Sequence, residues 1–243
     1  MTAKNHHVKD GTISRKAGFY HAEGGTRFCE AGSYFKKAQE EGWALGQFNV
    51  STLEALKAVV QAAKNLKSPV IVGTSEGESR FLGVKLTAVL TNALREETAL
   101  PLILNLDHGQ SLEYIKEAVE AGYGAVHFDG SKLSVEDNIQ IARKIVQYAH
   151  KKDVLVEGEI SAIGGASKKL GKAPEIREED LTDPDIAEKF IIKTGVDSLA
   201  VNIGTFHGVE IKENEFVGKH INFKRLRELR EKIGKKVFLV LHG

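Results

Sequence analysis

Residues 104–109, "LNLDHG", end an apolar run with an Asp-His-Gly triplet. Two later stretches have the same form: residues 200–208 read "AVNIGTFHG", and residues 239–243 read "LVLHG". Each begins with a short apolar run typical of a buried strand. Three strands that each lead to a His-Gly pair indicate three loops at one edge of a parallel sheet, and this pattern decides the fold.

Short apolar runs alternate along the chain with segments of helical periodicity, which predicts successive strand–helix units. Seven runs are predicted to be strands: residues 46–50, 70–74, 102–106, 125–129, 154–160, 198–204 and 237–241. Helix starts are predicted at Ser51 (with Glu54 as a capping box), Ser111, Ser134, Asp183 and Asn222. A further helix over residues 33–42 precedes the first strand and is expected to cross the bottom of a barrel.

This repetition favours an α/β fold of the TIM (β/α)₈ barrel type, of which seven strands are visible. An open doubly wound sheet normally has a glycine-rich turn after its first strand, and "NVSTLEA" at residues 49–55 has none. We expect an N-terminal arm over residues 1–32 and a single catalytic domain, an incomplete barrel, over residues 33–243.

The composition excludes several classes of partner. The formal net charge of the 243 residues is +1, so nothing indicates nucleic acid. No apolar stretch approaches the roughly 18 residues of a membrane span. Cys29 is the one cysteine, which predicts a reducing, cytoplasmic location. The pair His6-His7 lies in the polar arm, and we predict no metal site there.

Polar side chains follow the predicted strands at the ends that meet at the mouth of a parallel barrel. They are Asn49, Ser75, Asp107, His108, Asp129, Glu157, Glu159, His207 and His242. Three imidazoles on three strands are typical of a zinc site that keeps one position open. Asp129 and Glu159 are predicted to hold a second ion, or the same ion in a second position.

Other histidines are interpreted differently. A lone histidine at a strand end is usually structural, but three in the same place, each followed by glycine, favour a metal site. His127 precedes Asp129 by two residues and therefore faces the same side of its strand. We interpret it as a core residue or as one that supports the ligands from behind. His21, His150 and His220 are assigned no role.

The motifs "LDHG", "FDGS", "VEGEI…IGG", "DSLAVNIGTFHG" and "LVLHG" together resemble the class II, metal-dependent fructose-bisphosphate or ketose-bisphosphate aldolases, from about Ser33 onward. The resemblance implies that Asp107 is the catalytic proton donor. It implies zinc ligands at His108, His207 and His242 and a second metal position at Asp129 and Glu159. It also implies substrate or phosphate contacts from Asn49, Ser75, Gly208 and Gly243.

The implied reaction is the reversible cleavage of fructose 1,6-bisphosphate to dihydroxyacetone phosphate and glyceraldehyde 3-phosphate, a lyase step (EC 4.1.2.13-like) of glycolysis and gluconeogenesis. A divalent ion, Zn²⁺ or another, suits the negative charge that cleavage develops. No lysine ends a predicted strand, which disfavours a Schiff-base mechanism. A homo-oligomer is expected for a full-length form.

The sequence departs from the family pattern in two places. Ala166 and Ser167 stand where the family usually has acidic residues that help to move the proton, and Glu157 or Glu159 are candidates to compensate. The family also continues beyond "LHG" into a serine-bearing phosphate loop, an eighth strand and terminal helices. We therefore expect an open barrel, with no pairing between residues 46–50 and 237–241, in a chain prone to aggregation.

Three alternatives stay open on the sequence. The substrate could be tagatose 1,6-bisphosphate or another ketose phosphate. The chain could be a truncated, non-catalytic fragment that binds metal. A zinc hydrolase on the same barrel is the third, and it would need a base beside metal-bound water rather than a bisphosphate pocket.

Overall fold

The computed structural model describes residues 20–21, 27–28, 30–170, 174–212, 215–216 and 221–243. Much of the predicted arm, with His6 and His7, lies outside these residues, as does His220. Within the arm, β1 (Tyr20–His21) pairs antiparallel with β2 (Arg27–Phe28).

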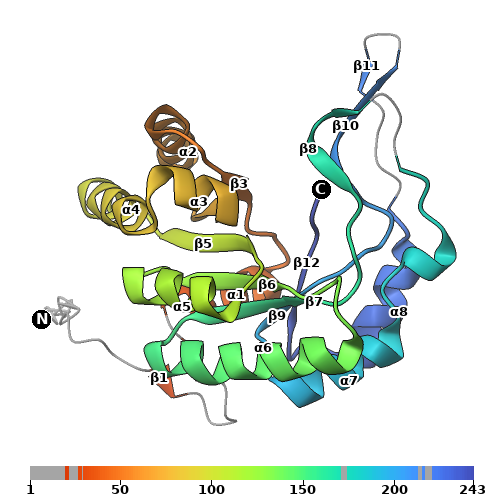
Figure 1. The fold of residues 1–243 in the computed structure, drawn as a ribbon. Helices are drawn as coiled ribbons and strands as arrows, with labels where there is room; N and C mark the ends of the chain where they lie inside the picture. The colour runs from red at the N-terminus through yellow and green to blue at the C-terminus, as the bar shows by residue number, and fades with distance from the viewer. Residues whose placement is uncertain (1–19, 22–26, 29, 171–173, 213–214, 217–220) are drawn as a thin grey trace, which may run out of the picture.

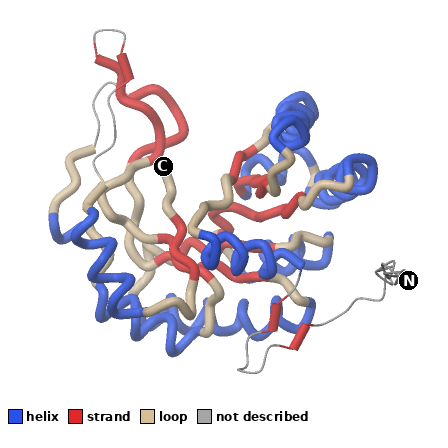
Figure 2. Tube along the Cα trace, turned by 180° about the vertical axis from the view of Figure 1, so that it is seen from behind, coloured by secondary structure: helices blue, strands red, loops and turns tan. Residues whose placement is uncertain are grey.

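All seven predicted strands are present and form one parallel sheet, ordered β12-β9-β7-β6-β5-β4-β3. They are β3 (Gln47–Asn49), β4 (Val70–Ser75), β5 (Leu102–Gly109), β6 (Ala125–Asp129), β7 (Leu155–Glu159), β9 (Ser198–Ala200) and β12 (Phe238–Val240). The sheet curls into a half-barrel, with helices along its outer side (Figure 1, Figure 2).

Eight α-helices lie in the described part of the chain. They are α1 (Glu30–Glu41), α2 (Leu53–Leu66), α3 (Glu76–Leu82), α4 (Val84–Thr98), α5 (Leu112–Ala121), α6 (Val135–Ala149), α7 (Pro184–Thr194) and α8 (Phe223–Ile233). Short 3₁₀ turns occupy His150–Lys152 and Glu178–Asp180. The sequence analysis named neither α3 nor α4, which fill the long connection between β4 and β5.

Most predicted helix starts are confirmed by side-chain caps. Ser111, Ser134, Asp183 and Asn222 each accept a backbone N–H of the first turn. The predicted capping box at Ser51 is wrong. Thr52 caps α2 instead, because its hydroxyl, one residue later, accepts the N–H of Ala55 at 3.2 Å.

Alternation along the strands separates two apolar layers. Leu102, Leu104 and Leu106 of β5 face the helices in the large outer core. Ile103 faces the other way, into a second cluster with Ala31 of α1 and residues near the start of β4, β6 and β7. This second cluster confirms that α1 covers the bottom of the sheet, so the polar strand ends are left at the opposite, open end.

A second, smaller sheet stands beside that open end. It contains β8 (Gly165–Leu170), β10 (His207–Lys212) and β11 (Glu215–Phe216), in the order β11-β10-β8. Figure 1 shows it projecting past the ends of the long strands, next to the C-terminus. The sequence analysis did not foresee this sheet. The sixth predicted strand is correspondingly shorter, because β9 stops at Ala200.

The half-barrel is open, as predicted. β3 and β12 are the two outermost strands, and the described residues contain no ladder between them. Phe48 of β3 is 55% exposed. Among the described helices, none has the length and apolar character needed to cross a bilayer.

The open edges predict self-association of this 243-residue chain, since unpaired strand edges are templates for pairing with other chains. Sedimentation velocity should show concentration-dependent oligomers or aggregates. Phe48→Lys places a charge on the β3 edge and should reduce them. Phe81→Lys is the matched control, because Phe81 is 81% exposed and belongs to helix α3 rather than to a strand, and it should leave association unchanged. A monodisperse monomer in every case would contradict the prediction.

Candidate metal centre

Six of the predicted site residues meet at the open end of the sheet. They are Asp107, His108, Asp129, Glu159, His207 and His242. The in-register pairing of β6 with β7 places Asp129 opposite Glu159. Two residues deeper on the same strands, His127 is paired with Glu157, and both face the same inward side.

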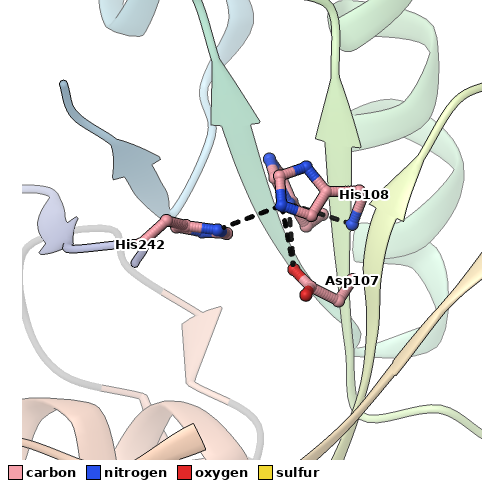
Figure 3. Close-up of side chains that lie close together, drawn as sticks. Asp107, His108 and His242 are labelled. Atoms are coloured by element: carbon pink, nitrogen blue, oxygen red, sulfur yellow. Dashed lines mark hydrogen bonds and ion pairs between the residues drawn. The ribbon is translucent and has the colours of Figure 1, made fainter. Parts of the chain in front are cut away.

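His108 and His242 face each other across the site (Figure 3). Nδ1 of His242 lies 3.2 Å from Nε2 of His108. Nδ1 of His108 lies 3.1 Å from Oδ2 of Asp129, and Nε2 of His242 lies 2.8 Å from Oε1 of Glu157. Ionised carboxylates only accept hydrogen bonds, so we place the ring protons on the two nitrogens that face Asp129 and Glu157.

This assignment leaves two ring nitrogens face to face, each with a lone pair. Either an additional proton or a cation must lie beside them. Two nitrogens bound to one tetrahedral zinc at about 2.0–2.1 Å are separated by roughly 3.3 Å, close to the distance found here. The carboxylate–histidine pairs behind them match the usual support of metal-binding imidazoles. The donor set therefore fits a divalent cation.

His207 lies against both of these rings. Its ring centroid is 4.9 Å from that of His108 and 5.8 Å from that of His242. Its Nε2 is buried and has no hydrogen-bond partner. Burial, with the neighbouring imidazoles, lowers the pKa of His207 to about 4, so the ring is neutral near pH 7. A neutral imidazole with a buried, unpartnered nitrogen also fits a cation.

The possible ligand atoms fall into two groups in which all atoms lie within 4.8 Å of one another. One contains Asp107, His108, His127 and His242, and the other contains His108, Asp129 and Glu159. His207 is in neither group, although its ring touches two of the members. His108 is shared: its Nε2 faces the first group, and its Nδ1 lies 3.7 Å from Oε2 of Glu159 in the second.

The charges of the carboxylates follow from their contacts. Burial by itself would raise the pKa of Asp129, but hydrogen bonds from His108 and Ser131 outweigh it and hold the pKa well below its usual range. Ser131 donates its hydroxyl to Oδ1 of Asp129 at 2.6 Å. Burial likewise opposes ionisation of Glu157, and the hydrogen bond from His242 helps to lower the pKa of Glu157 in spite of it. Asp129 and Glu157 are therefore ionised at neutral pH.

The side-chain amide of Asn49, on β3, holds Asp107. Nδ2 of Asn49 donates to Oδ2 of Asp107 at 2.8 Å. Oδ1 of Asn49 accepts from Gln47 at 3.3 Å, and Gln47 in turn accepts from Asn105 at 2.9 Å. This series of hydrogen bonds links β3 to β5, and it gives Asn49 a role in orienting Asp107.

Gly73 makes room for this contact. A Cβ at Gly73 would lie 2.0 Å from Oδ1 of Asn49. We predict that Gly73→Ala displaces the Asn49 side chain and costs about 10²-fold in turnover, as misplacement of a reacting group by about 1 Å does. The free energy of unfolding should change by less than about 1 kcal/mol, because only a side-chain end must move. Steady-state kinetics and thermal melting measure both quantities.

Gly124→Ala is the matched control for Gly73→Ala. Its new methyl group would meet no atom nearer than 3.8 Å, and Gly124 lies just before β6, at the bottom of the sheet. It should retain normal turnover. Equal activity of the two variants would show that the Asn49–Asp107 contact does not matter for the reaction.

The remaining predicted contacts have more ordinary local explanations. Ser75 caps α3 and forms a reciprocal capping box with Glu78. Gly208 has a φ of 95°, which favours glycine. Gly109 is required for another reason: a Cβ there would lie 2.9 Å from the carbonyl oxygen of His127. The roles of Ser75, Gly208 and Gly243 toward substrate stay predictions.

His127 is buried behind the ligands, as interpreted from the sequence, whereas Glu157 was named only as a candidate to move a proton. Both lie two residues before a predicted ligand on an inward strand face, and this spacing was the signal for them. Glu157 is bonded to His242, so it is committed to orienting that ring. Ala166 and Ser167 fall in β8, whose pairing with β10 begins at Gly165 opposite His207.

Comparison with known proteins agrees with this geometry. The sequence profile of the class II fructose-bisphosphate aldolases matches residues 30–243. The chain belongs to this family. The YdjI aldolase from Escherichia coli K12 is 30% identical and superposes with a TM-score of 0.72, over 87% of this chain and 71% of that chain. The fructose-bisphosphate aldolase of Campylobacter jejuni, 24% identical, shares the fold with a TM-score of 0.70, over 88% of this chain and 69% of its own.

Because the chain belongs to this family, its general activity is that of a lyase that carries out aldol chemistry on sugar phosphates. Family members are generally dependent on zinc, and the His/Asp cluster described here is a possible metal-binding group. The resemblance drawn from the sequence motifs is confirmed.

Proposed function

We propose that this protein is a zinc-dependent aldolase that reversibly cleaves fructose 1,6-bisphosphate to dihydroxyacetone phosphate and glyceraldehyde 3-phosphate. The observation that carries the proposal is the pair of ring nitrogens of His108 and His242. They lie 3.2 Å apart, and each ring is held from behind by a carboxylate. The family assignment supplies the reaction class.

We assign His108, His207 and His242 as the residues that would hold the ion. Asp129 and Glu159 would hold a second ion, or the same ion in a second position, on the other side of His108. When bound, a divalent cation supplies a Lewis acid that stabilises negative charge on a carbonyl oxygen. His207 completes the set because its unpartnered Nε2 is buried against the other two rings.

Asp107 is the group we assign to proton transfer. It lies next to a ligand, and Asn49 holds one of its oxygens. The other oxygen lies 3.9 Å from Nε2 of His108 and 3.4 Å from Nδ1 of His127. In cleavage, Asp107 would take the proton of the hydroxyl group that becomes the aldehyde; in condensation it would return that proton.

The wider assignment has three parts. We treat residues 33–243 as one catalytic unit that belongs to a TIM-type barrel, with residues 1–32 as an arm. We place the protein in the reducing cytoplasm, because its single cysteine excludes an intrachain disulfide. We expect it to act as a homo-oligomer when full length, with neither nucleic acid nor membrane as a partner.

The test is cleavage of fructose 1,6-bisphosphate, followed by reduction of the released triose phosphates, with and without added Zn²⁺ or Co²⁺. Activity that a chelator abolishes and Zn²⁺ restores supports the proposal. Tagatose 1,6-bisphosphate, assayed in parallel, identifies the sugar by the ratio of kcat/KM values. Metal binding without cleavage of any ketose bisphosphate would contradict the proposed activity.

A further inference from the structure

Strand β5 contains a bulge at the site. Leu106 pairs with Val126, but the next pair joins Gly109 to Phe128, so β5 has one residue more than β6 in this interval. Within the bulge His108 has a φ of 50°, which residues other than glycine seldom adopt. Neighbouring residues in a regular strand face opposite sides, and the bulge is what lets Asp107 and His108 both face the site.

The bulge leaves the backbone N–H of His108 without a place in the regular ladder. A side chain on the neighbouring strand takes that place: His108 donates this N–H to Nδ1 of His127 at 3.1 Å. His127 is fully buried, so water does not compete for the bond. A buried backbone N–H needs a partner, and the His127 ring supplies it as a carbonyl would in an unbroken ladder.

This bond also determines the protonation of His127. Nδ1 also lies 3.4 Å from Oδ1 of Asp107, but the bond from the His108 N–H is shorter, at 3.1 Å. A nitrogen that accepts a hydrogen bond carries no proton, so we place the ring proton of His127 on Nε2. Nε2 lies 3.2 Å from Oε2 of Glu159. The two atoms face each other, but neither has a well-aligned hydrogen-bond partner. Although His127 lies within 4.8 Å of possible ligands, its protonated Nε2 therefore offers a cation no free lone pair.

We propose that His127 is a positioning residue that holds the His108 bulge through Nδ1 and keeps its protonated Nε2 facing the Glu159 carboxylate. This inference rests on the proposed function in one respect, which is that His108 and Glu159 bind metal. It goes beyond that proposal because it assigns the fourth histidine of the site to the geometry of the ligands and not to the ion.

Two substitutions test the bond from the His108 N–H to Nδ1. Asn places its amide oxygen near the position of Nδ1 and can still accept the His108 N–H. Leu has a similar size and can neither accept nor donate. The probe is Co²⁺ alone, whose visible spectrum reports coordination geometry, titrated into apo protein. A second measurement, amide hydrogen exchange of His108 in the apo protein, needs neither metal nor turnover.

For His127→Leu we expect a loss of Co²⁺ affinity of about 10–100-fold, as for other residues that support ligands, together with an altered spectrum and a fast-exchanging His108 amide. His127→Asn should keep the wild-type spectrum and the slow exchange, with affinity within about tenfold of wild type. This rescue is the result that a loss of packing alone would not give.

The inference is overturned if the Leu variant keeps wild-type exchange and affinity, or if the Asn variant loses as much as the Leu variant. If the Leu variant does not fold, Asn is compared with Gln, whose longer side chain reaches toward Nε2 instead. Asn must then protect the His108 amide better than Gln, and the reverse order overturns the inference. If wild-type protein binds no Co²⁺, the proposed function fails, while the exchange data still test the bulge.

Discussion

Asp107→Ala is expected to lower kcat by about 10²–10⁴-fold while the protein keeps its metal, the range typical for loss of a general acid–base group. Asp107 adjoins His108 in the chain, and Asn49 holds one of its oxygens at 2.8 Å. The side chain is therefore fixed beside the ligands, and we assign it to moving a proton. Steady-state kinetics with metal analysis of the same sample measures both quantities.

Asn49→Ala is the companion variant for Asp107→Ala. It removes the bond that orients the carboxylate and keeps the carboxylate itself, so it should lower kcat less than Asp107→Ala does. Near-normal turnover of Asp107→Ala would remove this residue from the proton-transfer role. Loss of metal with activity would instead make Asp107 a ligand, as its place within 4.8 Å of His108 and His242 permits.

His108→Ala should abolish metal binding and activity together. His108 is the one residue common to both groups of possible ligand atoms, because its Nε2 faces His242 and its Nδ1 faces Asp129. The loss of affinity should exceed the about 10–100-fold typical of residues that only support a ligand. Competition between the protein and a chromogenic chelator for Zn²⁺ gives the affinity directly.

His207→Ala provides the informative comparison with His108→Ala. If His207 is a ligand, its removal should also cost affinity well beyond that range, even though its nitrogens lie outside both groups here. His150→Gln is the control, because His150 is bonded to Asp197 at 2.9 Å and belongs to neither group. Wild-type Zn²⁺ affinity in His108→Ala would refute the proposed site.

The strands could be predicted from the sequence because burial in a parallel sheet leaves a local signature. Each of the seven needed only an apolar run bounded by polar or turn residues. The helix caps at Ser111 and Asp183 were readable for the same reason, since a cap depends on residues within one turn. The gathering of His108 and His242 followed from parallel topology, which brings strand ends to one edge.

Features that depend on partners distant in sequence were not predicted. The sheet of β8, β10 and β11 joins Gly165 to His207, about forty residues away, and no local pattern announces such pairing. Helix α3 was missed because Ser75 was interpreted as a substrate contact, whereas with Glu78 it forms a capping box. A serine at the end of a strand can either contact substrate or cap the next helix, and the sequence did not distinguish these two roles.

The sequence by itself determined which side chains reach the open end of the sheet, because that depends on strand position and topology. The tertiary structure alone decided that the side chains of Asp107 and His108 both point into the site. Strand alternation would have sent these neighbours to opposite faces. A bulge in β5, with a φ of 50° at His108, brings them together. That backbone persists because a buried ring on β6, His127, accepts the N–H that the bulge leaves unpaired.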